Sequence, residues 1–369
     1  MALTFRQAGD ADWPAIERFV GATYGEGAHF KHYARWRWQL ADNPCRTSPT
    51  GVEQWIAVAR DEVVGQIALQ AGRLHCDDLT MPAYWIVDVM VRPDWRGKRV
   101  SHGIHDAILA DRDVLVTLTM AEATRRIAMR AGAIELPPVF QLFRAHALKG
   151  RTVADFLAPR LQAGRVRRGV RTMIGTSAAL PALAAFAANR TTRPIRVTGA
   201  VAGCERLPPD YDAIANQPPG GTRGWFDRSP GWMDWRFQHV PDLAYHQAAM
   251  RDDGGDLLGH AVWRTPHDCE FPFGTLVDIN ARKGDPAVLS ALASHAVAAM
   301  EPWCEGITAG ASHPALLKIY RQLGFRKVKT HRPTVVVRDE GLRDAITAVG
   351  PHWHFSKADH DWDQIHPAH

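Results

Sequence analysis

The sequence predicts an α/β (α+β) fold in two tandem copies, each a mixed twisted sheet flanked by helices. Three landmarks recur in the same order, about 190 to 200 residues apart, within the same alternation of strands and helices. The recurring pairs are Trp36-Arg37-Trp38-Gln39 with Trp235-Arg236-Phe237-Gln238, 86–89 with 276–279, and more loosely 129–133 with 321–325. Equal order and near-equal spacing indicate duplication of one fold.

Each copy reads as a helix pair, antiparallel strands, an aspartate-bearing strand, a helix, a further strand and a last helix. Short strands are expected at 63–68 and 257–262, where apolar runs follow acidic turns. The last helices are expected at Glu122–Arg130 and 313–323, the second capped by Ser312 and ended by Gly324. The copies then span 1–148 and 196–340, with a connecting segment at 149–195 and a tail at 341–369.

The composition is that of a globular protein. The chain of 369 residues is 46% hydrophobic and 22% charged, and it is long enough for two domains. Its net charge of +5 suits an anionic ligand but does not by itself indicate nucleic-acid binding. The five cysteines form no Cys-x-x-Cys pair, so neither a disulfide framework nor a zinc knuckle is expected. The histidines of the tail lack a helical pair with a third ligand, so no metal site is expected there. The first residues lack the pattern of a secretory signal, and we expect a cytoplasmic protein.

A loop suited to phosphate is the most specific motif of the chain. An apolar strand at 85–91 leads through Pro93 to a short basic loop and then to a helix. Backbone N–H groups at a helix start lack partners, and the helix dipole adds positive potential, so this loop suits an anion. The arginines and the lysine of the loop add charge that fits a pyrophosphate.

This segment resembles the acetyl-CoA-binding motif of the GNAT (Gcn5-related) N-acetyltransferases. Val91-Arg92-Pro93 matches the strand end, and Arg96 matches the first loop position. Arg99 stands where the family has glycine, and Ser101 stands where the family has glycine or alanine. The resemblance implies an N-acyltransferase that uses acetyl-CoA or another acyl-CoA. It places the pantetheine, whose thioester carbonyl the strand amides would polarise, along Val89, Met90 and Val91. It places the pyrophosphate on Arg96, Gly97, Lys98, Arg99, Val100 and Ser101.

Two residues are candidates for the proton transfers of such a reaction. Asp88, within the apolar strand, could act as the base for an attacking ammonium; alternatively it is a structural carboxylate, which the recurrence of Asp278 favours. By the resemblance, a tyrosine four residues before the helix-ending glycine would protonate the CoA thiolate. Tyr320 holds that position in the second copy, where the first copy has Ala128; alternatively Tyr320 is a half-buried helix residue.

The loop of the second copy differs from that of the first. It reads Arg282-Lys283-Gly284-Asp285-Pro286, in which the aspartate would repel phosphate and the proline removes a backbone donor. We therefore expect acyl-CoA to bind the first copy only.

The acceptor is expected to be an amine. Trp36, Arg37 and Trp38 are candidate acceptor-binding residues, because aromatic rings stack on sugars and arginine binds carboxylates or phosphates; some of the tryptophans are expected in the core. The Trp-x-Phe and Asp-x-Asp pattern of the tail resembles the ends of tandem GNAT-like proteins associated with bacterial surface-polysaccharide synthesis. By that resemblance, an amino sugar of a surface glycan precursor is the expected acceptor.

Two other functions stay open from the sequence. One is transfer from aminoacyl-tRNA, as in the Fem-type ligases, which also pair two GNAT-like domains. The other is a sensor or scaffold that binds CoA without turnover. The connecting segment, basic and then apolar, is interpreted as a helical linker; the alternative is a peripheral contact of residues 162–188 with an anionic membrane.

Overall fold

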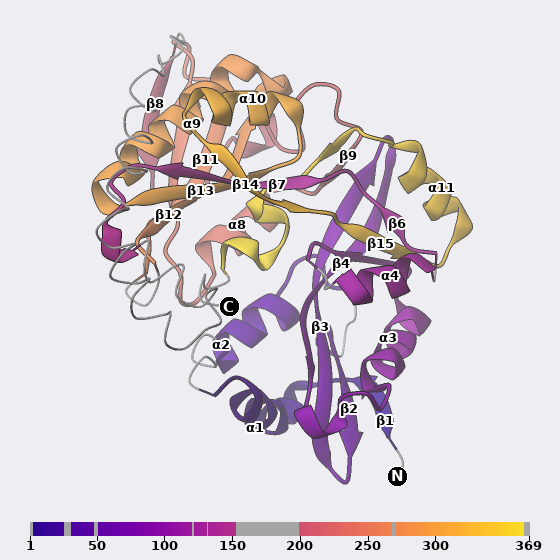
Figure 1. The fold of residues 1–369 in the computed structure, drawn as a ribbon. Coiled ribbons are helices and arrows are strands. Elements are labelled where there is room, and N and C mark those ends of the chain that lie inside the picture. Colours follow the sequence, from indigo (N-terminus) through magenta and orange to yellow (C-terminus); the bar gives the residue numbers. More distant parts are fainter. Residues whose placement is uncertain are drawn as a thin grey trace. The chain divides into compact units, whose positions relative to one another are not determined.

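The computed structural model describes residues 3–25, 31–47, 51–119, 122–130, 132–152, 199–267 and 271–364. These residues form two compact units, each with a mixed sheet and helices (Figure 1). The first unit comprises Met1–Pro138, Arg223–Leu243 and Arg332–Trp353, and the second comprises Val139–Thr222, Ala244–His331 and His354–His369. The predicted fold class is confirmed.

The sheet of the first unit follows the path β1-β2-β3-β4-β5-β15-β6. Along this path β4 and β5 pair in parallel, and the other described neighbours pair antiparallel. The elements of this unit are β1 (Thr4–Gln7), α1 (Trp13–Tyr24), α2 (Tyr33–Trp36), η3 (Arg37–Ala41), β2 (Gln54–Ala59), β3 (Glu62–Cys76), β4 (Leu79–Val91), α3 (Val100–Asp111), β5 (Val114–Thr117), α4 (Glu122–Arg130), β6 (Ile134–Glu135), β9 (Gly224–Phe226), α8 (Pro230–Gln238), β15 (Thr334–Val337) and α11 (Glu340–Ala348).

The sheet of the second unit follows the path β14-β7-β13-β12-β11-β10-β8, in which β12 and β13 are the parallel pair. Its elements are β7 (Val139–Ala145), β8 (Ala200–Cys204), β10 (His246–Arg251), β11 (Leu257–Arg264), β12 (Phe273–Ala281), α9 (Pro286–Met300), β13 (Gly306–Ala311), α10 (Pro314–Gln322) and β14 (Arg326–His331). The short β16 (Trp353–His354) and the turns η9 (Lys357–Asp359) and η10 (Asp361–Asp363) follow near the chain end.

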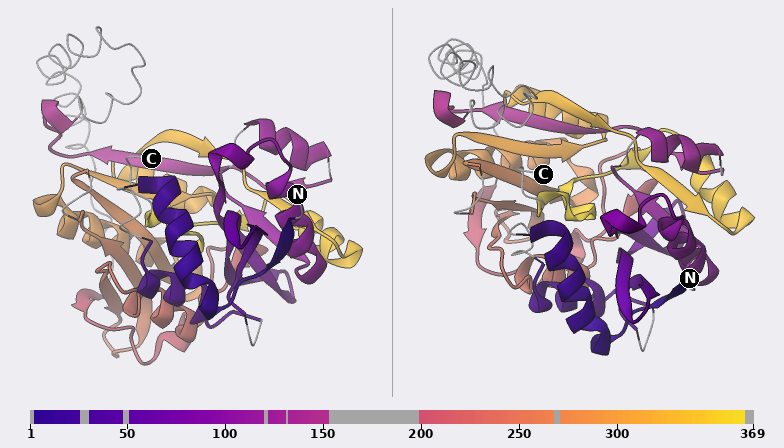
Figure 2. Two further views of the ribbon diagram at one scale, coloured as in Figure 1. Left: turned by 90° about the horizontal axis from the view of Figure 1, so that it is seen from below. Right: turned by 60° about the horizontal axis from the view of Figure 1, so that its bottom comes forward.

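The two sequence repeats within the chain each give one strand to the sheet of the other. β7, which comes from the first copy, lies between β13 and β14 in the sheet of the second unit. β15, which comes from the second copy, lies between β5 and β6 in the sheet of the first unit. The views show magenta β7 among orange strands and orange-yellow β15 beside purple strands (Figures 1 and 2). The compact units are therefore discontinuous in sequence, unlike the expected ranges 1–148 and 196–340. The expected linker lies outside the described residues from 153 onward.

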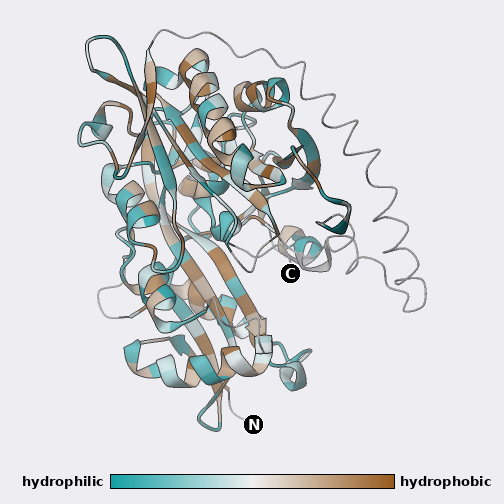
Figure 3. Cartoon of the chain, turned by 90° about the vertical axis from the view of Figure 1, so that its left-hand side faces the viewer, coloured by the Kyte–Doolittle hydropathy of each residue, from teal (hydrophilic) through white to brown (hydrophobic). Residues whose placement is uncertain are grey.

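In the first unit, apolar residues at helical spacing hold the helix after β4 on the sheet. Val100, Ile104 and Ile108 of α3 are buried at intervals of four residues. A Cβ atom on Gly65 of β3 would lie 2.7 Å from a Val100 methyl, so the glycine permits this close approach. Apolar stretches of the strands and helices are brown in Figure 3. This packing sets where the N-terminus of α3 stands relative to β4.

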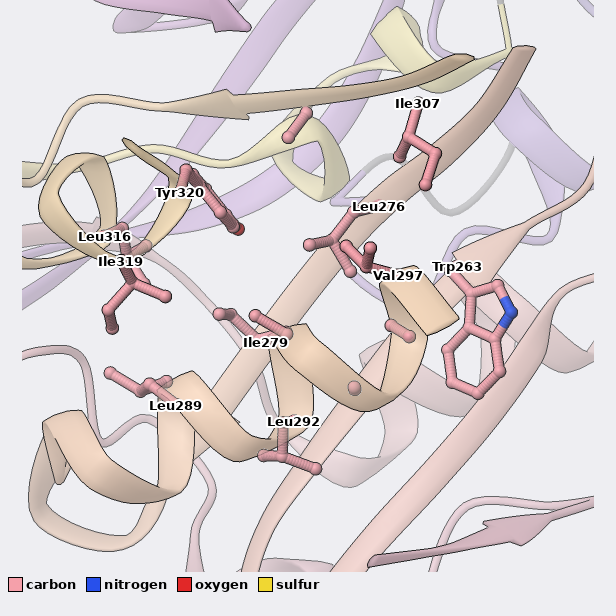
Figure 4. Packing of buried hydrophobic residues seen from close by; sticks show 14 of the residues in the cluster. Trp263, Leu276, Ile279, Leu289, Leu292, Val297, Ile307, Leu316, Ile319 and Tyr320 are labelled. Carbon is pink, nitrogen blue, oxygen red and sulfur yellow. The ribbon is translucent and has the colours of Figure 1, made fainter. Parts of the chain in front are cut away.

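In the second unit, α9 and α10 close the core over the sheet (Figure 4). The expected helix at 313–323 is found as α10, but its expected cap is wrong. Nδ1 of His313 accepts the hydrogen bond from the Ala315 amide at 3.3 Å, while the Ser312 hydroxyl accepts one from the Phe355 amide at 2.8 Å. Gly324 follows the helix with a φ of +87°, as a helix-ending glycine does.

Acid is expected to destabilise the second unit through His260. This fully buried imidazole lies 2.9 Å from Gln247 Oε1, and burial lowers its pKa to about 4. Between that pKa and the ordinary value near 6.5, the unfolded chain binds more protons than the folded one. The free energy of unfolding should therefore fall as the pH drops from 6.5 towards 4, by on the order of 3 kcal/mol for this group.

Urea titrations at several pH values would measure this slope. His260→Gln, which cannot be protonated, should show a shallower pH dependence than the wild type over the same range. Equal slopes for the two proteins would contradict the assignment to His260.

Candidate active site

In the first unit, strands β4 and β5 pair only over a short stretch in the middle of β4. The described parallel pairs are Tyr84 with Leu115 and Trp85 with Val116. β4 nevertheless continues to Val91. Among the described residues, the β5-facing edge of β4 therefore has no strand partner after Trp85. Backbone N–H and C=O groups along such an edge are available to an extended ligand.

A β-bulge lies at the start of this unpaired edge. Ile67 of β3 pairs with Val89 of β4, and Leu69 pairs with Ile86, so β4 has one extra residue between these pairs. The bulge coincides with Asp88 and its neighbour. Val89, which follows, is one of the few large apolar side chains that are half exposed, at 51%. The predicted residues Val89, Met90 and Val91 thus form the end of β4 beyond the bulge, where Val89 is exposed, Val91 is half-buried and Met90 is buried.

The loop after β4 has left-handed backbone at two positions. The short turn η4 (Pro93–Trp95) is followed by Gly97 with a φ of +79° and by Arg99 with a φ of +59° and a ψ of +20°. Glycine is favoured in this conformation because it has no Cβ. Arg99 stands where the motif has glycine, and its backbone adopts the shape for which glycine is favoured. The departure from the motif therefore changes the side chain and keeps the loop conformation.

The predicted phosphate-binding residues meet at the start of α3. The first backbone hydrogen bond of the helix joins the Gly103 amide to the Arg99 carbonyl at 3.1 Å, so the amides just before it belong to the open end of the helix. Arg96, Lys98 and Arg99 are exposed around this end, and Lys98 Nζ lies 4.7 Å from the centre of the Trp95 ring. Val100 is buried, so its side chain is not among the exposed groups at this end.

Asp88 has partners from the helical part of the first unit. It forms an ion pair with Nζ of Lys31, and the Tyr24 hydroxyl donates a hydrogen bond to its Oδ1 at 3.4 Å. The Lys31 ammonium also lies 5.2 Å from the centre of the Tyr24 ring. The side chains of Lys31 and Asp88 are 15% and 22% exposed, so the pair is partly shielded from water. Asp88 is thus a paired carboxylate at the bulge.

The predicted acceptor residues Trp36, Arg37 and Trp38 lie on α2 and η3. Both tryptophans are buried: the Trp36 indole donates to Gln54 Oε1 at 2.5 Å, and Trp38 stacks on Trp235 with ring centres 4.8 Å apart. Arg37 is partly exposed and forms ion pairs with Asp10 and Asp42. Of the three, only Arg37 presents its functional group at the surface.

A pocket of about 540 Å³ adjoins these residues within the first unit. Its wall is formed by α2, η3 and α8. The aromatic lining residues are Tyr33, Trp38 and Trp235, and the ionisable ones are Arg37, Asp42, Asp234 and His239. Asp234 and His239 lie 2.8 Å apart. The pocket therefore combines aromatic surface with charges of both signs.

In the second unit, Ser356 occupies the place where β12 and β13 diverge. These strands pair in parallel from Phe273 to Thr275 on β12. Beyond that point, Ser356 bridges to Ala311 of β13, and its hydroxyl donates to Asp278 Oδ1 of β12 at 2.6 Å. Ser356 therefore links the two strands at the position that has no described strand partner in the first unit.

Tyr320 lies in the core of the second unit (Figure 4). Its side chain is 2% exposed and packs against Phe325, with ring centres 5.5 Å apart. Burial raises the pKa of the Tyr320 hydroxyl well above its ordinary value, and the nearby Asp278 carboxylate raises it further. A fully buried phenol that holds its proton so tightly is poorly suited to protonate a thiolate.

The helix start in the second unit is also closed. The Asp285 carboxylate accepts a hydrogen bond from the Ala287 amide at 2.8 Å and so caps α9. A Cβ on Gly284 would lie 2.6 Å from the backbone of Pro218 and Pro219, so that loop covers the approach. This helix start thus has a capping carboxylate and a covering loop that the start of α3 lacks among the described residues, although Arg282 and Lys283 stand before it.

Sequence reasoning did not find Tyr24 and Lys31. Both lie about 60 residues before Asp88, in a region with no recognisable motif, so no spacing in the sequence indicates their meeting. Among the residues that the structure describes, no helix is long and apolar enough to cross a bilayer. No group of metal-binding side chains occurs among them either.

No protein-family model matches the sequence, and no curated protein matches it. Solved structures do match. They include a GCN5-related N-acetyltransferase from Anabaena variabilis, with a TM-score of 0.56, 11% identity, and coverage of 91% of this chain and 73% of that one. A tandem GNAT protein from the clavulanic acid biosynthesis pathway matches with a TM-score of 0.53, 12% identity, and coverage of 91% and 98%. Saccharomyces cerevisiae N-myristoyltransferase with bound myristoyl-CoA matches with a TM-score of 0.56, 10% identity, and coverage of 90% and 82%. The fold of this chain is that of the GNAT N-acetyltransferases in tandem.

Proposed function

We propose that the protein is an acyl-CoA-dependent N-acyltransferase that uses its first unit for acyl-CoA. The observation that carries this proposal is the unpaired edge of β4, which begins at a bulge and runs directly into a basic, left-handed loop at the start of α3. An extended molecule with a phosphate group at one end fits such an edge and loop. The match to a structure with bound myristoyl-CoA supports the same ligand class.

The residues present fit acyl-CoA, which supplies an acyl group activated as a thioester. Backbone groups of Val89, Met90 and Val91 would hold the pantetheine arm. The amides at the start of α3 would receive the pyrophosphate, together with the side chains of Arg96, Lys98 and Arg99 and the backbone of Gly97, Val100 and Ser101.

Asp88 is the group proposed to accept the proton of the attacking ammonium, because only the neutral amine is nucleophilic. Tyr320 takes no part in the proposed reaction, because it is a core residue of the second unit.

We propose an amine as the acceptor and acetyl as the acyl group, with an amino sugar of a glycan precursor as the first acceptor to test. The pocket beside Arg37 supports a polar, ring-shaped acceptor, since it joins aromatic surface to charged groups of both signs. Trp38 lines this pocket beside Arg37, whereas Trp36 is a core residue that does not line it.

Calorimetric titration with acetyl-CoA tests the proposal. The wild type should bind with micromolar affinity, and Arg96→Ala/Lys98→Ala should bind about 10- to 100-fold more weakly, because two charged contacts to phosphate are lost. Arg282→Ala/Lys283→Ala, in the corresponding loop of the second unit, is the matched control and should bind as the wild type does.

Each other result has a clear meaning. No binding by the wild type would contradict the proposal, and salt-sensitive binding of tRNA would then favour transfer from aminoacyl-tRNA. Binding without thiol release from any acyl-CoA, across a panel of amines, would favour a sensor or scaffold. Titration with myristoyl-CoA in parallel would measure the acyl length that the first unit accepts.

A further inference from the structure

Lys31 is a primary amine held against the candidate base of the first unit. Its ammonium forms an ion pair with the Asp88 carboxylate, and it faces the ring of Tyr24, whose hydroxyl donates to the same carboxylate. A carboxylate and an aromatic face around one ammonium are the features by which a protein recognises an alkyl amine. The cluster thus already holds a group of the kind that an N-acyltransferase would accept.

The cluster lies where the acyl group would be. Asp88 is in the bulge of β4, one residue before the exposed Val89, at the beginning of the edge that would hold the pantetheine arm. This placement rests on the proposed function. Because the amine belongs to the same chain and is already ordered beside the base, its reaction with a bound thioester would be effectively intramolecular.

We propose that the protein acylates itself at Lys31. The Lys31 ammonium gives one proton to the Asp88 carboxylate, and the neutral amine then forms a C–N bond with the acyl carbon of acyl-CoA. The C–S bond breaks, the CoA sulfur leaves with the bonding electrons, and it takes up a proton to give free CoA. The products are an amide on Nζ of Lys31 and one CoA thiol, with no oxidant or reductant involved.

The modification would change the charge of the site. An acylated Lys31 is neutral and no longer pairs with Asp88, so the carboxylate would become available to the ammonium of an external acceptor. Self-acylation would therefore convert an occupied amine subsite into an open one.

The test uses the full chain and isotope-labelled acetyl-CoA, with peptide mass spectrometry to locate the label. Lys149 is the internal control, because its side chain is 77% exposed and therefore reports non-enzymatic acetylation. Lys31 should be labelled at least about 100-fold faster than Lys149. Asp88→Asn should slow labelling of Lys31 by about 100-fold and leave Lys149 unchanged, since the general base is lost.

A second measurement tests whether Lys31 lies beside bound CoA, and it needs no acyl transfer from CoA. Trace labelling with acetic anhydride, which needs no CoA, should modify Lys31 less when unacylated CoA is present, and should modify Lys149 equally with and without it. Wild-type protein that binds CoA in the calorimeter yet labels Lys31 no faster than Lys149 would overturn this inference and leave the proposed function standing. Failure of the wild type to bind CoA would instead remove the proposed function, and this inference with it.

Discussion

Glu53→Ala is expected to lower the free energy of unfolding by about 3–5 kcal/mol, because it leaves a buried arginine without its partner. Glu53 is fully buried, and Arg112 is 9% exposed. The guanidinium reaches both carboxylate oxygens, with Nη2 lying 3.2 Å from Oε1 and 3.0 Å from Oε2. It also lies about 5 Å from the rings of Trp55 and Tyr84, so this packing limits its access to water.

Denaturant titration followed by tryptophan fluorescence would measure the loss. Arg92→Ala is the control for an exposed pair, since Arg92 binds Glu62 and Asp94 at the surface; it should cost less than about 1 kcal/mol. Replacing both partners, as Glu53→Met/Arg112→Leu, should cost less than Glu53→Ala alone. A loss for Glu53→Ala as small as that of the exposed control would contradict the argument.

Trp38→Ala should cost a further large amount, about 3–5 kcal/mol, through loss of a packed indole. Trp38 is 4% exposed and stacks on Trp235 with an angle of 17° between the rings. Each indole donates a hydrogen bond to the backbone carbonyl of the other residue, at 2.9 and 3.0 Å. The mutation therefore removes a ring and leaves the buried Trp235 carbonyl without this donor, while the Trp38 carbonyl remains to accept from the Trp235 indole.

Comparing Trp38→Ala with a variant of its neighbour separates a structural role from direct contact with an acceptor. Arg37→Ala is the matched neighbour, because Arg37 pairs at the surface with Asp10 and Asp42 and should change stability by less than about 1 kcal/mol. If Arg37→Ala raises KM for the acceptor with little loss of stability, the charge contacts the acceptor. A Trp38→Ala protein as stable as the wild type would contradict the core role assigned to this ring.

The duplication, the fold class and the loop before α3 were predictable from local pattern. Val91-Arg92-Pro93 and the basic loop lie within one short segment, so their structure depends on neighbours in the sequence. The left-handed Arg99 was not predictable, because an arginine has no intrinsic preference for that conformation and only the surrounding turn imposes it. The cap at Ser312 failed for a related reason, since the distant Phe355 competes for that hydroxyl.

The strand exchange and the cluster of Asp88, Lys31 and Tyr24 could not be predicted from the sequence. β7 and β15 have equivalent places in their copies, and either sheet offers a similar slot, so only the three-dimensional connection decides which strand enters which sheet. Lys31 and Tyr24 contact Asp88 from positions 57 and 64 residues earlier in the sequence, and no periodicity indicates these contacts.

The exchanged strands also govern how the protein folds as it is synthesised. Val114 pairs with Val337, so the sheet of the first unit is complete only after nearly the whole chain has been made. At about 5–20 residues per second, the exposed edge of β5 waits on the order of ten seconds or more for its partner. We therefore expect nascent chains that end before residue 334 to depend on chaperones, and the N-terminal half made alone to aggregate.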